Sequence, residues 1–374
     1  MHIAIIRQRY NPYGGAERFV SRALVALNNT DIKASLIARQ WEPIEGINFV
    51  QCNPFYLGRL WRDWGFAKQV CRQIDALKPD LVQSHERVFC CDIYRAGDGV
   101  HRVLVEQKAK NLSWPAKTFL RFSPYHNYVK MAEKKLLENP RLRAVICNSA
   151  MVRSQILQYF AIDESKIHVI YNGVDTTKFH PRIKQQQSDL RAELNLSEEA
   201  SVFAFVGSGF ERKGLLQALR AFSGLTENCH LLVVGYDKRK NFYHKEANRL
   251  GISARVKFLG PQKNVLPYYA VADALILPTF YDPFPNVALE ALACGVPVIT
   301  STMSGAAEVI TNHQNGFVCD AYDLQGFQDA MQVLCDKGIA KGMGEQARRS
   351  AEKFDLDTMA VHLTNLYRNL LAPK

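Results

Sequence analysis

The chain has 374 residues, a length typical of two domains, and 47% of them are hydrophobic, which is enough for two cores. No apolar run approaches the ~20 residues of a membrane-spanning helix, so the composition excludes that class of anchor. The nine cysteines form no Cys-x-x-Cys pair and have no zinc spacing. An odd, scattered set predicts reduced thiols in a cytoplasmic protein.

The net charge of +11 is unevenly distributed along the chain. Residues 1–170 contain 25 Lys and Arg against 15 Asp and Glu, whereas the remaining residues contain 22 against 21. The first half therefore carries +10 and the second half +1. This asymmetry predicts that the N-terminal half meets an anionic partner.

Apolar strands alternate with helical segments, a pattern typical of doubly wound parallel sheets. The start, MHIAIIRQRYNPYGG, predicts a strand over His2–Arg7 rather than a signal peptide, because it has no small-residue cleavage site. Gly14 and Gly15 then open an amphipathic run to Leu27. Further strands of this first series are predicted at Ala34–Ala38, Leu81–His85 and Ala144–Asn148.

A glycine-rich turn, RAGDGVHR, places Asp98 and His101 after a strand. On the residues alone, the favoured interpretation is a loop aspartate beside a surface histidine.

The next segment, residues 102–135, combines eight Lys and Arg with two glutamates and several aromatic residues. This mixture predicts helices that lie in an anionic membrane interface. The predicted membrane-facing residues are Trp114, Lys117, Phe119, Arg121, Phe122 and Lys130. The alternatives are an ordinary helical excursion packed on its own domain and nucleic-acid binding. We expect no nucleic acid, because no recognition motif accompanies the charge.

A second series of strands begins after residue 200. The segment before it, Ile170–Pro181, has turn chemistry at Asn172-Gly173 and no apolar face, so the domain junction is placed there. The predicted strands are Val202–Val206, His230–Val234, Val256–Leu259, Ala274–Leu277 and Pro297–Thr300.

The stretch VGSGFERKG, residues 206–214, leaves a strand and enters a helix. Gly207 and Gly209 allow close backbone approach, and Lys213 can reach a phosphate at the start of the helix. The alternative is a plain strand–helix turn with solvated basic residues.

The most informative stretch is YDPFPNVALEALACGVPV, residues 281–298. Asp282 lies in a loop, and a helix predicted over Asn286–Ala293 contains Glu290. On a fully helical path of ~1.5 Å per residue the two carboxylates would lie about 12 Å apart, farther than the roughly 5–9.5 Å of a hydrolase pair. The spacing suits one ligand with two diols, such as a nucleotide sugar. The alternative is a buried helix with two incidental acids.

The C-terminal segment Asp355–Leu371 has apolar residues at helical spacing, which predicts an amphipathic helix. The only Asp-x-Asp motif, Asp355–Asp357, stands at its start, where N-capping explains it better than metal binding.

The stretch 281–298 resembles the carboxylate-x7-carboxylate signature of retaining glycosyltransferases of family GT4, which have the GT-B fold. Phe284, Pro285 and the run EALACGVP match, whereas the usual first Glu is Asp282 and the Gly that often follows is Pro283. The resemblance implies that Asp282 faces the donor sugar and Glu290 the ribose. It also implies a nucleotide-sugar site that includes Phe284, Pro285, Asn286 and Val287.

The stretch 206–214 is similar to the family loop that grips the donor diphosphate. The family Arg falls on Ser208, so Arg212 would supply that charge from another position, beside Lys213. The resemblance further implies that Gly14 and Gly15 bring backbone N–H groups to the donor. One of Asp98 and His101 would face the reacting sugar, and which of the two does so stays open.

The resemblance implies two Rossmann-like domains, 1–170 for the acceptor and membrane and 171–353 for the nucleotide sugar, with helix 354–374 crossing back. RQRYNPYGGAERF, AGDGVHR and VGSGFERKG are similar in particular to glucosyltransferases of lipopolysaccharide core synthesis. They imply retaining transfer from UDP-glucose to an inner-core heptose, which gives an α-linkage. The acceptor would be lipid-anchored, at the cytoplasmic face of the inner membrane.

Retaining transfer in this fold is expected to proceed by front-face attack, in which a donor phosphate oxygen takes the acceptor proton. Lys213 and helix N-termini would stabilise the leaving diphosphate, so neither a metal ion nor another cofactor is expected. Two other functions stay open at this point: a nucleotide-sugar epimerase of the same fold and a membrane-binding scaffold without catalysis.

Overall fold

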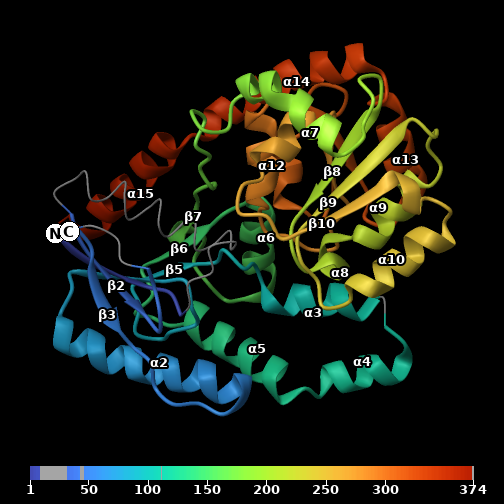
Figure 1. The fold of residues 1–374 in the computed structure, drawn as a ribbon. Helices are drawn as coiled ribbons and strands as arrows, with labels where there is room; N and C mark the ends of the chain where they lie inside the picture. The colour runs from blue at the N-terminus through green and yellow to red at the C-terminus, as the bar shows by residue number, and fades with distance from the viewer. Residues whose placement is uncertain (9–31, 43–45, 111, 373–374) are drawn as a thin grey trace. The chain divides into compact units, whose positions relative to one another are not determined.

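A computed structural model describes residues 1–8, 32–42, 46–110 and 112–372, without the side chains of Gln186 and Gln187. The chain forms two compact units (Figure 1). The first comprises Met1–Asn172 and Leu356–Lys374, and the second comprises Gly173–Asp355. Gly14 and Gly15, which we predicted at the donor site, lie outside the described residues.

The first unit is built on a seven-stranded sheet with the order β3-β2-β1-β4-β5-β6-β7. Every neighbouring pair of strands in this sheet is parallel. Successive strands run outward from β1 in one direction and from β4 in the other, so the order reverses between them. In open parallel sheets ligands bind beyond the carboxyl ends of the strands at such a reversal. The strands are β1 (His2–Ile6), β2 (Lys33–Ala38), β3 (Asn48–Gln51), β4 (Leu81–Ser84), β5 (Ile93–Arg95), β6 (Ala144–Cys147) and β7 (Ile167–Val169).

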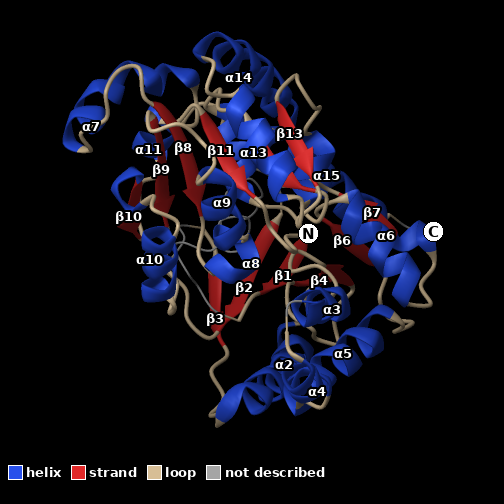
Figure 2. Cartoon of the chain, turned by 90° about the vertical axis from the view of Figure 1, so that its right-hand side faces the viewer, coloured by secondary structure: helices blue, strands red, loops and turns tan. Residues whose placement is uncertain are grey.

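Helices surround this sheet (Figure 2). They are α2 (Gly58–Leu77), α3 (His101–Lys110), α4 (Trp114–Arg121), α5 (Pro124–Leu137), α6 (Ala150–Tyr159) and α15 (Leu356–Leu371). The last of them, α15, belongs to the first unit although it follows the whole of the second unit in sequence. Its buried residues Met359, Leu363 and Tyr367 join the core formed by the sheet strands, because they recur on one face at helical spacing.

The second unit contains a six-stranded parallel sheet with the order β10-β9-β8-β11-β12-β13, and its order reverses between β8 and β11. The strands are β8 (Ser201–Val206), β9 (Cys229–Val234), β10 (Val256–Gly260), β11 (Ala274–Leu277), β12 (Val298–Ser301) and β13 (Gly316–Cys319). The helices are α7 (Gln187–Glu193), α8 (Phe210–Lys213), α9 (Leu215–Phe222), α10 (Lys240–Arg249), α11 (Leu266–Val271), α12 (Asn286–Ala293), α13 (Leu324–Val333) and α14 (Lys337–Ala351).

The predicted fold class, two doubly wound parallel sheets, is confirmed. The sequence did not reveal β3, β5, β7 and β13, which have only three or four residues each. Three of these strands lie at sheet edges, where one side of the strand needs no apolar neighbour, and their residues lack a continuous apolar run. Within the part of the chain that the structure describes, no helix is long and apolar enough to cross a bilayer.

The prediction that all nine cysteines are reduced is wrong for two of them. Cys71 on α2 and Cys90 in the loop after β4 form a disulfide, with their Cα atoms 5.7 Å apart. The 19-residue separation carries no recognisable motif, because the two residues meet only when α2 packs beside the loop after β4. The other seven cysteines are free thiols.

The attachment of α15 to the first sheet generates a prediction. The Tyr367 hydroxyl donates a hydrogen bond to Gln83 Oε1 on β4 at 2.7 Å, and both side chains are fully buried. Tyr367→Phe should leave the Gln83 oxygen without this donor and lower the unfolding free energy by about 1–3 kcal/mol, as measured by urea denaturation. The matched control is Val361→Ala on the exposed face of α15, which should change stability by less than about 0.5 kcal/mol. Equal effects of the two changes would contradict the role of this hydrogen bond.

Candidate functional site

The candidate site of the second unit is formed by the loops that follow β8, β11 and β12. The Arg212 carbonyl accepts hydrogen bonds from Phe280 N and Thr279 Oγ1, both at 2.9 Å, which ties the loop after β11 to α8. Asp282 N donates to Met303 O at 3.0 Å, and Gly305 N donates to Asp282 O at 2.9 Å. The backbone of Asp282 is thereby fixed by the loop after β12.

The side chain of Asp282 is held by two cations from α8. Lys213 Nζ lies 2.6 Å from Asp282 Oδ2, and Arg212 Nη1 lies 3.2 Å from the same oxygen. Lys213 and Asp282 are almost fully buried, whereas the Arg212 side chain is 41% exposed. Arg212 Nη1 also donates to Tyr281 O at 2.9 Å. The structure therefore brings three of the predicted donor-site residues into direct contact.

The protonation states follow from burial and charge. Burial opposes ionisation of Asp282 most strongly, but the attractions of Lys213 and Arg212 outweigh it and hold the pKa of the carboxyl below its usual value. Burial lowers the pKa of the Lys213 ammonium, although Asp282 and, more weakly, Glu290 oppose this shift. The charges of both predicted carboxylates thus favour the protonated form of Lys213.

Two glycines give the chain room at this site. Gly207 has a φ of +148°, and a Cβ there would lie 3.2 Å from Lys213 Cε, so the absence of a side chain leaves space for the lysine stem. Gly214 has a φ of +78°, and a Cβ would lie 2.0 Å from the Pro278 carbonyl oxygen. Only glycine permits this close approach between the turn after α8 and the loop after β11.

Glu290 lies on α12, where all eight residues of the helix are buried and Glu290 is 0% exposed. Tyr269 Oη lies 3.4 Å from Glu290 Oε2 and 3.4 Å from Val287 O. Helix α12 begins after Pro285, directly after the loop that carries Asp282, and has no side-chain N-cap. Phe284, Pro285, Asn286 and Val287, also predicted for this site, are buried at the same helix start.

Ser208 differs from the other predicted donor-site residues. It is exposed, and its hydroxyl accepts a hydrogen bond from Tyr236 N at 3.1 Å. Because the hydroxyl oxygen acts as the acceptor in that bond, its O–H group can still donate a hydrogen bond to a ligand.

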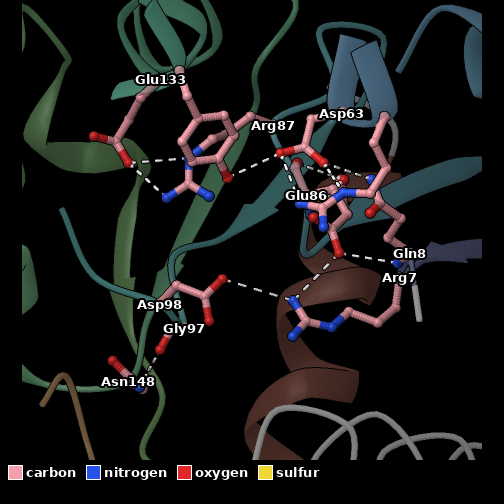
Figure 3. Close-up of polar contacts among 12 residues, drawn as sticks. Arg7, Gln8, Asp63, Glu86, Arg87, Gly97, Asp98, Glu133 and Asn148 are labelled. Atoms are coloured by element: carbon pink, nitrogen blue, oxygen red, sulfur yellow. Dashed lines mark hydrogen bonds and ion pairs between the residues drawn. The ribbon is translucent and has the colours of Figure 1, made fainter. Parts of the chain in front are cut away.

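A second polar cluster occupies the carboxyl ends of β1, β4 and β5 in the first unit (Figure 3). Arg7 Nη1 lies 3.4 Å from Glu86 Oε1 and 3.8 Å from Asp98 Oδ2. Gln8 N donates to Glu86 Oε1 at 3.0 Å. The Asp98 side chain is 50% exposed. Asp98 therefore reaches solvent beyond the carboxyl end of β5, next to the strands between which the order reverses.

His101 occupies a different environment, and the expectation of a surface histidine is wrong. It is buried at the start of α3, and its backbone N donates to Glu133 Oε2 at 3.0 Å. Arg87 Nη2 donates to the other oxygen of Glu133 at 3.1 Å. His101 Nε2 lies 3.0 Å from His126 Nδ1. Burial, helped by the charge of Arg87, lowers the pKa of His101 to about 3, so the imidazole is neutral at neutral pH.

The predicted membrane-facing residues lie on α4 and α5 and in the turn that joins them. The side chains of Trp114, Phe119 and Phe122 are 79%, 82% and 69% exposed. Lys117 and Arg121 are exposed as well, whereas Lys130 is half-buried. Helix α4 contains no buried residue, whereas α5 buries one face, so the alternative of a helix packed on its own domain describes α5 better than α4.

Sequence reasoning missed several residues of these clusters. Two of them belong to no motif that we considered. Tyr269 contacts Glu290, and Ser304 forms an isolated β-bridge with Asp282. Glu133 was counted only as one of two acids in a basic segment, although it is buried and bonded to Arg87. The signal that could have found it is its place among Val129, Ala132 and Leu136 on the buried face of α5.

The Lys213–Asp282 pair generates a stability prediction. Asp282→Asn removes the partner of a buried ammonium, so we expect the unfolding free energy at neutral pH to fall by about 3 kcal/mol or more. The Asp282 pKa is lowered in the folded chain, so its contribution is present above the usual aspartate pKa and is lost as pH falls through the folded value. The difference between parent and variant should therefore shrink only below a pH of about 3.9.

Urea denaturation across this pH range measures the effect, with Glu345→Gln on the exposed surface of α14 as the control. A parent–variant difference that is the same at every pH would contradict the ion pair.

Comparisons with known proteins cover both units. A family model described as Glycosyltransferase Family 4 matches residues 13–178, and one described as Glycosyl transferases group 1 matches residues 186–350. An uncharacterised glycosyltransferase of Methanocaldococcus jannaschii is 27% identical over 231 residues, which are 60% of this chain and 59% of that protein. The N-acetyl-alpha-D-glucosaminyl L-malate synthase of Bacillus anthracis is 31% identical over 209 residues, 55% of this chain and 54% of that protein. The chain thus spans little more than half the length of these curated relatives.

Solved structures show the same fold over nearly the whole chain. WaaG, a glycosyltransferase involved in lipopolysaccharide biosynthesis, has a TM-score of 0.82 at 20% identity and covers 97% of this chain and 99% of its own. Anabaena HepE in complex with UDP-glucose has a TM-score of 0.77 at 19% identity and covers 99% of this chain and 100% of its own. With a family 4 domain followed by a group 1 domain, the chain belongs to the glycosyltransferases of the GT-B fold.

Proposed function

We propose that the chain is a retaining glucosyltransferase that transfers glucose from UDP-glucose to an inner-core heptose of lipopolysaccharide, the reaction of a core glucosyltransferase I. The observation that carries the proposal is the buried contact of Lys213 with Asp282 at the reversal point of the second sheet. WaaG supports the class of acceptor through its role in lipopolysaccharide biosynthesis, and HepE supports the donor through its complex with UDP-glucose.

The donor diphosphate would bind at Lys213 and Arg212. An ammonium has three N–H donors, so the bond to Asp282 leaves two for phosphate oxygens. Arg212 is partly exposed and can form charge-assisted bonds with the same group. Ser208 adds a hydroxyl donor, and the uncapped start of α12 adds backbone amides. Asp282 would meet the hydroxyls of the sugar, and Glu290 those of the ribose.

During transfer, the bond between the anomeric carbon and the diphosphate oxygen breaks, and charge accumulates on the leaving diphosphate. Lys213 and Arg212 would stabilise that charge from fixed positions, which is the form of electrostatic catalysis that requires no reorganisation. The acceptor hydroxyl attacks from the same face and passes its proton to a phosphate oxygen, so the configuration is retained. No metal ion enters this proposal.

The acceptor side belongs to the first unit. Asp98 reaches solvent beside Arg7, so of the two residues left open by the sequence it is the one we assign to the reacting sugar. Neutral His101 would act through position, because its ring nitrogen is bonded to His126 and its backbone to Glu133. The exposed aromatic and basic residues of α4 would contact the anionic membrane that carries the acceptor.

The donor site yields a prediction that separates this function from its rivals. Glu290→Gln and Lys213→Ala should each weaken UDP binding about tenfold or more in calorimetry, because a charged hydrogen bond is worth roughly 1.5–3 kcal/mol. Asp282→Ala should reduce turnover more than UDP affinity. Activity is measured by product mass with a panel of UDP-sugars and truncated core lipopolysaccharide.

The control is Glu345→Gln, far from these residues in the sequence and exposed. Release of free sugar or an isomerised UDP-sugar without a glycan product would indicate an epimerase instead. Lipid binding without UDP-sugar binding would indicate a scaffold.

Metal dependence is a separate prediction. Glucose transfer should continue at an unchanged rate in excess chelator, because the proposed site meets the diphosphate with Lys213, Arg212 and helix amides. The measurement compares initial rates with and without chelator, and then with added Mg²⁺ or Mn²⁺. Complete loss that Mg²⁺ or Mn²⁺ restores would overturn this prediction and direct attention to Asp355 and Asp357.

A further inference from the structure

Helix α2 presents apolar side chains on two neighbouring faces at its N-terminal end, one buried and one exposed. Its inward face packs against the unit through Phe66, Ala67 and Val70, which are buried. Its outward face and the turn before it carry large apolar residues that are exposed, Phe55, Leu57, Leu60, Trp61 and Trp64. Phe55 and Leu57 are 79% and 77% exposed. We refer to these five residues as the α2 cluster. The inward face alone suffices to pack the helix, so the fold does not explain the cluster.

Exposed apolar residues are ordinary when single, but a contiguous group on a soluble surface marks a site of interaction. Trp61 packs edge-on against Phe55, with ring centroids 5.6 Å apart. Lys68 Nζ lies 5.3 Å from the centre of the Trp64 ring. Phe55 and Trp61 thus contact each other, and Trp64 contacts a basic neighbour. Leu60, Trp61 and Trp64 are three or four positions apart on the helix and are therefore neighbours on its surface, so these residues form one patch.

This patch is adjacent to the segment that carries α4. The Tyr125 hydroxyl at the start of α5 donates to Asp63 Oδ2 on α2 at 3.1 Å. Helix α5 begins at Pro124, three residues after α4 ends at Arg121. Both views show α2, α4 and α5 at the same end of the first unit (Figures 1 and 2). The α2 cluster and the aromatic residues of α4, about 55 residues apart in sequence, thus lie at one end of the first unit, where a hydrogen bond joins α2 to α5.

The residues around the α2 cluster are mostly basic, which indicates an anionic partner. From Leu57 to Arg72 the chain carries Arg59, Arg62, Lys68 and Arg72 but only one acid, Asp63. That acid is already engaged by Arg62 Nε at 2.7 Å and by Tyr125. From Leu112 to Pro124 there are two basic residues and no acid. The apolar residues are therefore bordered by uncompensated positive charge.

We propose that the α2 cluster is a second membrane anchor, which inserts Trp61 and Trp64 at the headgroup level of an anionic bilayer beside the α4 contact. Tryptophan favours that level because its ring is apolar and its N–H can stay hydrated. Lys68 and Arg59 lie where their charges can meet lipid phosphates. The inference extends the membrane contact that is part of the proposed function, and it supplies an anchor that residues 102–135 do not contain.

Fluorescence distinguishes the two anchors because the chain has only four tryptophans. In a Trp41→Phe/Trp114→Phe protein, all tryptophan emission arises from Trp61 and Trp64. Vesicles of phosphatidylglycerol and phosphatidylcholine with brominated acyl chains should quench this emission. The control protein keeps only Trp41, which packs against the core of the first unit, and should not be quenched.

Sedimentation with unlabelled vesicles of the same lipids tests the contribution to binding. Trp61→Ser/Trp64→Ser should reduce partitioning by about tenfold or more, because each indole carries roughly 150–250 Å² of surface. Val361→Ser, which removes an exposed apolar residue of α15, should have no effect. Binding of the parent should fall with added salt and on vesicles of phosphatidylcholine alone. UDP-glucose affinity should remain unchanged in both variants.

A third variant, Lys117→Gln/Arg121→Gln/Lys130→Gln, separates this inference from the contact of α4. If this triple variant loses vesicle binding while Trp61→Ser/Trp64→Ser binds like the parent, the α2 anchor is wrong and the α4 contact stands. The same conclusion follows if brominated lipid does not quench the emission of Trp61 and Trp64. If the parent binds no vesicles, both membrane contacts fail, and the glycosyl transfer reaction is judged by its own assay. If Trp61→Ser/Trp64→Ser instead dissociates an oligomer in analytical ultracentrifugation and leaves lipid binding unchanged, the cluster is a protein interface and the inference is overturned.

Discussion

The second unit depends on a buried ammonium that, among the described residues, forms a close ion pair with one carboxylate. Lys213 and Asp282 are almost fully buried and 2.6 Å apart, and a charge in that position is costly unless its partner is held in place. The structure meets this requirement with backbone hydrogen bonds that tie the loops after β8, β11 and β12 to one another. The same bonds make the cluster rigid. A rigid arrangement of charge is what stabilisation of a developing diphosphate requires.

The first unit also contains an ion pair with a buried carboxylate, Arg87–Glu133, but this pair positions a turn of the chain. Glu133 is buried, and its two oxygens accept bonds from Arg87 and from the backbone of His101. This arrangement fixes the start of α3 directly after the turn that carries Asp98. The Arg87–Glu133 pair thus positions the turn that carries Asp98 and is itself mostly buried. In the second unit, by contrast, the Arg212 side chain is partly exposed to solvent. Each sheet carries a polar cluster at its reversal point, and in the second unit this cluster combines the buried Lys213 with the partly exposed Arg212.

The parts of this arrangement that are local in sequence could be predicted, and the rest could not. Helix α12 begins and ends at the predicted residues, because the turn before it and the glycine after it are encoded nearby. The contact of Lys213 with Asp282 joins residues 69 positions apart, and no spacing rule specifies it. The disulfide of Cys71 and Cys90 and the burial of Glu133 depend on how helices pack on the sheet. The four-residue strands β4, β6, β11 and β12 were predicted, whereas β5, with the three residues Ile93–Arg95, offers no comparable apolar run.

The distribution of charge can be traced to surfaces once the fold is known. The first unit contains both the surplus of positive charge in residues 1–170 and the exposed aromatic residues of α2 and α4, whereas residues 171–374 are nearly neutral. Helix α4 buries no residue, so its apolar side chains contribute little to the stability of the unit. A soluble nucleotide sugar reaches a site from bulk water and requires no such surface. An acceptor held in a lipid layer does require one, because an enzyme that approaches it must remain near the bilayer with one side turned toward it. The concentration of basic and aromatic residues on one unit is the arrangement expected when only one of two substrates is fixed to a membrane.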